Sequence, residues 1–113
     1  MKTFFDGMFI ERAKLEDAGI KYPIKLEYYK TTMEEENVKE KYGIEVVKTE
    51  YKNNTVNVET KEMNNLTNNE EKIDKILNLL KNNEVTPISV EDILLDLLEH
   101  WYLRSYRGLV YMY

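Results

Sequence analysis

Two neighbouring segments constrain the fold of this chain more than any other feature. Tyr42 to Tyr51 is rich in β-branched and aromatic residues, and Thr55 to Thr60 alternates valine with polar residues. Such compositions favour strands. Lys52-Asn53-Asn54 lies between the two segments, and asparagine tolerates the positive φ that tight turns require. The sequence therefore predicts a β-hairpin.

A further strand is predicted before this hairpin. From Ile24 to Tyr29, apolar and polar residues alternate, which places Ile24, Leu26 and Tyr28 on one face of an extended chain. Pro23 precedes the strand, where its missing N–H need not join the hydrogen-bond ladder. The acidic run from Glu34 to Glu36 is interpreted as a solvated loop.

Two helices are predicted after the hairpin. Thr67 and Glu70 have the spacing of a capping box, and the helix should end near Asn82 and Asn83. Its apolar face is formed by Ile73, Ile76, Leu77 and Leu80.

The second helix is expected to start at Ser89, with Asp92 in its first turn and Ile88 packed on Ile93, and to reach Arg107 before Gly108. Its apolar stripe comprises Ile93, Leu94, Leu97, Leu98 and Trp101, extended by Leu95 and Tyr102.

The two ends of the chain are harder to interpret. Apolar residues near the N-terminus approximate a helical stripe, which predicts a helix from about Asp6 to Ala18 that ends at Gly19. A hairpin that turns at Asp6-Gly7 is the alternative. At the other end, Leu109 to Tyr113 has strand composition.

These elements predict one small α+β domain that spans residues 1–113. We expect an antiparallel three-stranded meander packed against the two C-terminal helices, together with an N-terminal helix. A four-stranded sheet that includes the C-terminal tail is the alternative.

Val85-Thr86-Pro87-Ile88, between the two predicted helices, and four segments around it resemble the shared pattern of a family of short uncharacterised proteins from anaerobic Gram-positive bacteria. The resemblance covers roughly Pro23 to Leu98, and Val85-Thr86-Pro87-Ile88 is its most specific piece. The other matching segments are Tyr42 to Val46, Leu66 to Ile73, Glu91 to Ile93 and Asp96 to Leu98. The resemblance implies a small bacterial cytosolic protein of unknown activity, and it assigns no functional residues.

The composition narrows the choice of partner and location. A formal net charge of -5 argues against binding to duplex nucleic acid, because such binding relies on lysine and arginine at the phosphates. The chain has no cysteine and no apolar run of membrane-spanning length, so we expect a cytoplasmic protein that does not insert into membranes. No motif points to a cofactor.

One cluster on the last helix could bind a metal ion. Asp92, Asp96 and His100 recur every four residues along one helical face, with Glu99 beside them. A solvated acidic face is the favoured interpretation, because a single helix offers no converging second element. No nucleophile adjacent to a base is evident, so we expect a protein without catalytic activity.

The aromatic C-terminal end points to binding instead. Interfaces are enriched in aromatic residues and arginine, and this segment supplies Trp101, Tyr102, Arg104, Tyr106, Arg107, Tyr111 and Tyr113. The sequence therefore predicts a protein-binding or regulatory module, with a protein partner or self-association as the contact. The alternatives are a phage-type anti-defence inhibitor or acidic nucleic-acid mimic, and a metal-dependent activity at the last helix.

Overall fold

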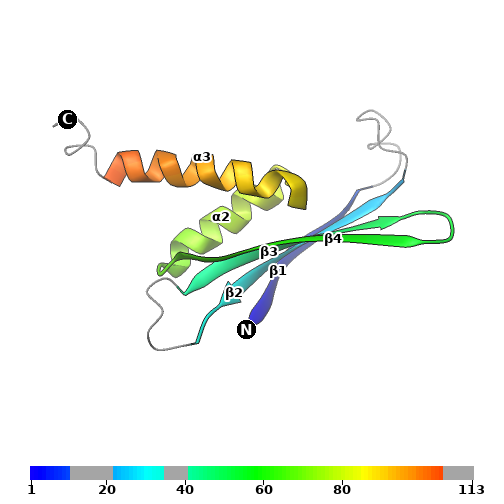
Figure 1. The fold of residues 1–113 in the computed structure, drawn as a ribbon, viewed down its shortest axis with the longest axis horizontal. Coiled ribbons are helices and arrows are strands. Elements are labelled where there is room, and N and C mark those ends of the chain that lie inside the picture. Colours follow the sequence, from blue (N-terminus) through cyan, green and yellow to red (C-terminus); the bar gives the residue numbers. More distant parts are fainter. Residues whose placement is uncertain (11–21, 35–40, 106–113) are drawn as a thin grey trace.

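Four antiparallel strands form one sheet, and two helices pack on a single face of it (Figure 1). The structure is a computed structural model that describes residues 1–10, 22–34 and 41–105, with side chains described as far as Leu97. The strand order is β1-β2-β3-β4. The elements are β1 (Lys2–Ile10), β2 (Ile24–Thr32), β3 (Tyr42–Tyr51), β4 (Val56–Thr67), α2 (Glu70–Asn82) and α3 (Pro87–Ser105).

The predicted three-stranded meander is confirmed as β2, β3 and β4. β3 has the predicted bounds, and Tyr51 pairs with Val56 across the turn. β4 continues beyond the predicted Thr60 to Thr67. Its register with β3 shifts only near Tyr42 and Ile44, so the strand stays paired until it leads into α2.

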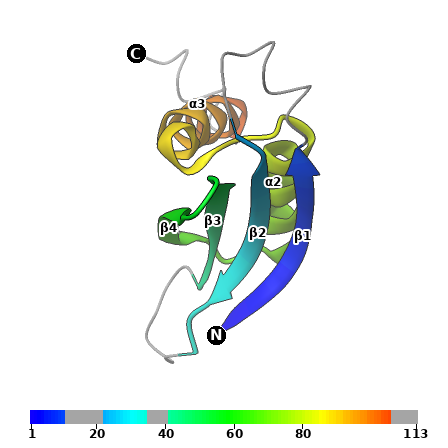
Figure 2. The same cartoon turned by 90° about the vertical axis from the view of Figure 1, so that its right-hand side faces the viewer.

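The N-terminal segment is a strand, and both predictions for it were wrong over the described residues. Asp6 pairs with Tyr28 and Gly7 with Glu27, so neither a helix nor a turn forms there (Figure 2). A shift in register between Phe4 and Asp6 breaks the regular alternation, which is why the apolar residues imitate a helical stripe. Residues 11–18 of the predicted helix lie outside the described residues.

The fourth strand of the sheet therefore comes from the N-terminal end of the chain. The segment proposed for that role, Leu109 to Tyr113, lies outside the part that the structure describes.

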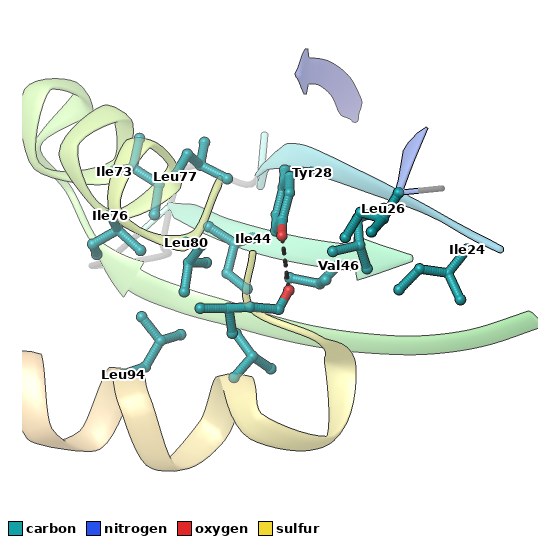
Figure 3. Packing of buried hydrophobic residues seen from close by; sticks show 13 residues of the cluster. Ile24, Leu26, Tyr28, Ile44, Val46, Ile73, Ile76, Leu77, Leu80 and Leu94 are labelled. Carbon is teal, nitrogen blue, oxygen red and sulfur yellow. Dashed lines mark hydrogen bonds between the residues drawn. The ribbon is translucent and has the colours of Figure 1, made fainter. Parts of the chain in front are cut away.

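The core lies between the sheet and the two helices (Figure 3). Tyr28 is fully buried, and its hydroxyl donates a 2.8 Å hydrogen bond to the carbonyl oxygen of Val85, in the linker between α2 and α3. The buried apolar residues are Ile10, Ile24, Leu26, Tyr28, Ile44, Val46, Ile73, Ile76, Leu77, Leu80, Val85, Val90 and Leu94.

Helix α2 has the predicted apolar face and end but a different cap. Asn69 is the N-cap, and its side-chain oxygen accepts a 3.1 Å hydrogen bond from the backbone N–H of Lys72. Thr67, the predicted cap, lies two residues earlier and accepts from the N–H of Asn69. An asparagine in the extended conformation fulfils the capping role as well as threonine does.

Ion pairs attach α2 to the sheet. Lys30 of β2 lies 2.9 Å from Asp74 and 3.3 Å from Glu70, and Lys81 lies 2.6 Å from Asp6 of β1. Burial alone would lower the pKa of Lys30, but hydrogen bonds to Asp74 and Glu70 outweigh it and leave that pKa raised.

Helix α3 starts at Pro87, earlier than the predicted Ser89. Proline suits the first helical position because its φ is already helical and its missing N–H would have no partner there. Ile88 is 84% exposed, so the predicted contact with Ile93 does not anchor this end. The predicted end at Arg107 lies outside the described residues. Neither α2 nor the described part of α3 is long and apolar enough to span a bilayer.

Candidate interaction surface

Most of the predicted site residues lie where the structure describes no side chains. Trp101, Tyr102 and Arg104 belong to the last turns of α3, whose side chains from residue 98 onward are outside the described part. Tyr106, Arg107, Tyr111 and Tyr113 are outside it altogether. Their role as interface anchors stays a prediction.

The metal-binding candidate receives no support from the part of α3 with described side chains. Asp92 and Asp96 are both exposed there, and His100 lies beyond it. Among the described residues, no three His, Cys, Asp or Glu side chains come together as potential metal ligands.

The face of the sheet that the helices leave uncovered is a candidate surface that the sequence did not predict. Residues directly opposite one another on paired strands point to the same face, so the register defines this surface. One row across the sheet runs Phe9, Lys25, Thr49 and Val58; the next runs Gly7, Glu27, Val47 and Thr60; a third runs Phe4, Tyr29, Glu45 and Glu62. Tyr51 and Val56 pair beyond the first row. We call these residues the open face.

Apolar side chains are exposed at one end of the open face. Phe9 is 58% exposed, Val58 60% and Val56 56%. The ring of Phe9 lies 6.0 Å from that of Tyr51, measured between centroids, although β2 separates their strands. These four side chains form an uncovered apolar cluster on three strands.

A second aromatic pair lies further along the face. Phe4, 56% exposed, meets Tyr29 edge to face at 5.6 Å. The ring of Phe4 lies over Gly7, since a Cβ there would be in van der Waals contact with it at 3.4 Å. The Lys2 ammonium lies 4.6 Å from the centroid of Tyr29, within the range of a cation–π contact.

Several charged groups of the open face form ion pairs. Lys2 binds Glu45 at 3.0 Å, and Lys25 lies 3.7 Å from Glu27. The Tyr29 hydroxyl donates a 2.8 Å hydrogen bond to Glu27, and this bond, with some burial and the carboxylate charges, raises the pKa of Tyr29 to about 12. The open face thus combines apolar patches with ion pairs.

An open depression of about 470 Å³ lies beside the Lys2–Glu45 pair. Its lining includes Lys2, Thr31, Lys41, Glu45, Glu62 and Asn64. Both lysine and glutamate side chains line it, and Lys2 already neutralises Glu45. It offers hydrogen-bonding groups rather than a nucleophile with an adjacent base.

Sequence reasoning missed this surface because Phe4 and Phe9 fit a helical stripe, and the predicted helix from about Asp6 to Ala18 includes Phe9. One signal was available: Val56 and Val58 share a face in any strand over Thr55 to Thr60. Their alignment with Phe9 depends on pairings that span the whole sheet, from β1 to β4.

Comparison with protein families gives one match. Residues 8–100 match the model of a family described as a family of unknown function (DUF6514). Comparison with curated proteins and with solved structures gives no match.

Proposed function

We propose that this chain, which belongs to the DUF6514 family of unknown function, is a non-enzymatic module that binds a protein partner through its open face. The family match covers most of the chain and carries no activity with it. The proposal therefore rests on the surface itself.

The exposed apolar cluster carries the proposal. Phe9, Tyr51, Val56 and Val58 lie together on a face that no described helix covers. Contiguous exposed apolar surface on a protein of this size generally marks a contact site. Aromatic residues are also the side chains that contribute most to protein interfaces.

The charges of the face fit a protein partner better than a phosphate-bearing one. Lys2 and Lys25 are each paired with a glutamate, and Glu62 adds a further negative charge. Stacking platforms for single-stranded nucleic acid normally lie in a positive groove. Protein–protein interfaces combine apolar and aromatic anchors with polar groups, and here Lys25 and Glu27 lie among the apolar side chains as an ion pair.

The same pairing weighs against an acidic mimic of nucleic acid. A mimic requires a row of unpaired carboxylates to take the place of phosphates. Glu27 and Glu45 are each paired with a lysine, so the open face does not supply such a row. The C-terminal aromatic residues stay a proposed extension of the binding surface, and a cytoplasmic location stays an expectation based on the absence of cysteine.

Affinity capture with matched variants tests the proposal. The double variant Phe4→Ser, Phe9→Ser removes two exposed rings of the open face, and Ile88→Ser removes an apolar side chain on α3 that is even more exposed. Wild type and Ile88→Ser should recover the same stoichiometric protein from a lysate of the native cell, and the double variant should lose it. Equal recovery by all three chains would place the contact elsewhere, and thermal melts must first show that the variants are folded.

A further inference from the structure

The two edges of the sheet differ in how they are protected. β1 and β4 are the outer strands, and an outer strand presents unpaired backbone groups that can bind another strand. β1 has a register shift between Phe4 and Asp6, an irregularity that discourages such pairing. β4 pairs with β3 in unbroken register from Val56 to Met63, with no proline or glycine.

The first half of β4 is also uncovered on both faces. Every residue from Val56 to Thr60 is exposed. This part of the β3–β4 hairpin projects beyond the two helices (Figure 1). The cover by α3 begins further along, where Lys61 lies 3.3 Å from Glu91. Val56 to Thr60 is therefore a regular, accessible edge strand.

In this segment, the backbone N–H and C=O groups that are not bonded to β3 point away from the sheet edge toward a possible further strand. The N–H of Tyr51 donates a 3.1 Å hydrogen bond to the carbonyl oxygen of Pro23, so the backbone of Tyr51 faces β2. In an antiparallel pair of strands, when one residue turns its N–H and C=O away from the other strand, the residue directly opposite does the same. Val56 is opposite Tyr51, so its N–H and C=O point to the outside, and those of Val58 and Thr60 follow by alternation.

We propose that a second copy of this chain pairs with this edge, antiparallel and centred on Val58, to give a dimer with one continuous sheet. The segment is chemically self-complementary about that residue. Val58 lies opposite Val58 of the second copy, and Val56 lies opposite Thr60. Pairs of β-branched side chains stabilise antiparallel strands.

The polar residues of the segment fit the same arrangement. Asn57 lies opposite Glu59 of the second copy, where an amide can donate to a carboxylate. Lys48 lies 3.9 Å from Glu59 within each chain and offsets part of its charge. Pairing centred one residue later would place Glu59 opposite Glu59 and is disfavoured by repulsion.

This inference shares Val56 and Val58 with the apolar cluster of the proposed function, but it rests on the free backbone groups of the β4 edge. The dimer would present two open faces side by side on the same surface of one sheet. Strand pairing over so short a segment buries less than the roughly 1,200 Å² of a stable interface. We therefore expect a weak dimer whose population depends on concentration.

Single cysteines test the pairing and its register in a chain that has no other cysteine. Directly opposed residues in a hydrogen-bonded antiparallel pair have Cα atoms about 5.5 Å apart, which permits a disulfide. Val58→Cys should form a disulfide-linked dimer under mild oxidation. Thr60→Cys should stay monomeric, because its counterpart is displaced by four residues, roughly 13 Å. Equal cross-linking of the two variants would overturn the proposed register.

Sedimentation velocity tests the dimer without a covalent bond. The wild-type chain should shift from 13.5 kDa toward twice that mass as its concentration rises. Val58→Pro removes an outward N–H that the β3–β4 ladder does not use, and Val58→Lys adds a charge at the two-fold axis. Both variants should stay monomeric, whereas the matched control Ile88→Lys on α3 should dimerise like wild type. A wild-type chain that stays monomeric up to about 1 mM would overturn the proposal.

Discussion

The hydroxyl of Tyr28 and the carbonyl oxygen of Val85 lie 57 residues apart in the sequence and 2.8 Å apart in the fold. This hydrogen bond connects the middle of β2 to the linker between the helices. The linker is held at the same point by the N–H of Val85, which donates to the carbonyl oxygen of Leu80, and by Glu84, whose φ of 50° reverses the chain. The Val-Thr-Pro-Ile segment singled out in the sequence thus has a structural role, since it fixes the start of α3 over the core.

Removing the Tyr28 hydroxyl should destabilise the protein measurably. Tyr28→Phe leaves the buried carbonyl of Val85 without its partner, which should cost about 1 to 3 kcal/mol in the free energy of unfolding. Urea denaturation would measure the loss. Tyr29→Phe is the matched control on the open face and should change stability by about 0.5 kcal/mol or less. Equal effects of the two changes would contradict the structural role of the Tyr28 hydroxyl.

The same residue predicts a loss of stability at alkaline pH. Burial, reinforced by the charge of Glu84, raises the pKa of Tyr28 well above its ordinary value. The unfolded chain releases this proton near pH 10 while the folded chain retains it, so the stabilising contribution is complete below pH 10 and falls as the pH rises further. The difference in unfolding free energy between wild type and Tyr28→Phe should be constant up to about pH 9 and then shrink. A difference that grows above pH 10 would contradict this.

Two glycines of the sheet should respond differently to the same substitution. A Cβ at Gly43 would meet the Met63 carbonyl oxygen and lie 2.8 Å from the Cα of Asn64, both backbone atoms of β4. At Gly7 the nearest backbone atom would be 3.1 Å away. Gly43→Ala should therefore lower the melting temperature clearly, by the equivalent of about 1 to 3 kcal/mol. Gly7→Ala should lower it less, and the reverse order would show that the close approach of β3 to β4 is wrong.

The N-cap of α2 gives a further test. Asn69→Ala removes the acceptor for the N–H of Lys72 and should cost about 1 kcal/mol. Asn69→Asp keeps an acceptor and should retain most of the stability. Chemical denaturation of both variants would distinguish this cap from the predicted one, because a cap at Thr67 would leave Asn69→Ala without effect.

Much of the fold follows from local patterns in the sequence. The strands at Ile24 and Tyr42 were predicted because alternation and β-branched composition act over a few residues. The face of α2 was predicted because Ile73, Ile76 and Leu77 recur at helical spacing. Each of these signals lies within a few neighbouring residues, and no other secondary structure fits the same residues equally well.

The parts that were not predicted depend on distant contacts. Phe4, Phe5, Met8 and Phe9 fit a helical stripe as well as a strand with a bulge, and only pairing with β2 decides between them. The open face depends on the register of all four strands, which no single segment encodes. Helix α3 begins at Pro87 instead of after a cap at Ser89, because proline suits the first helical position.

Site-specific photo-cross-linking in the native cell tests the binding function most directly. A benzophenone amino acid in place of Phe9 would present a reactive ring on the open face, and the same group at Ile88, a more exposed position, would present it on α3. The proposed function predicts that the Phe9 position links to one protein in high yield and that the Ile88 position does not. Equal labelling from both positions, or no protein adduct from Phe9, would contradict a protein-binding role for the open face.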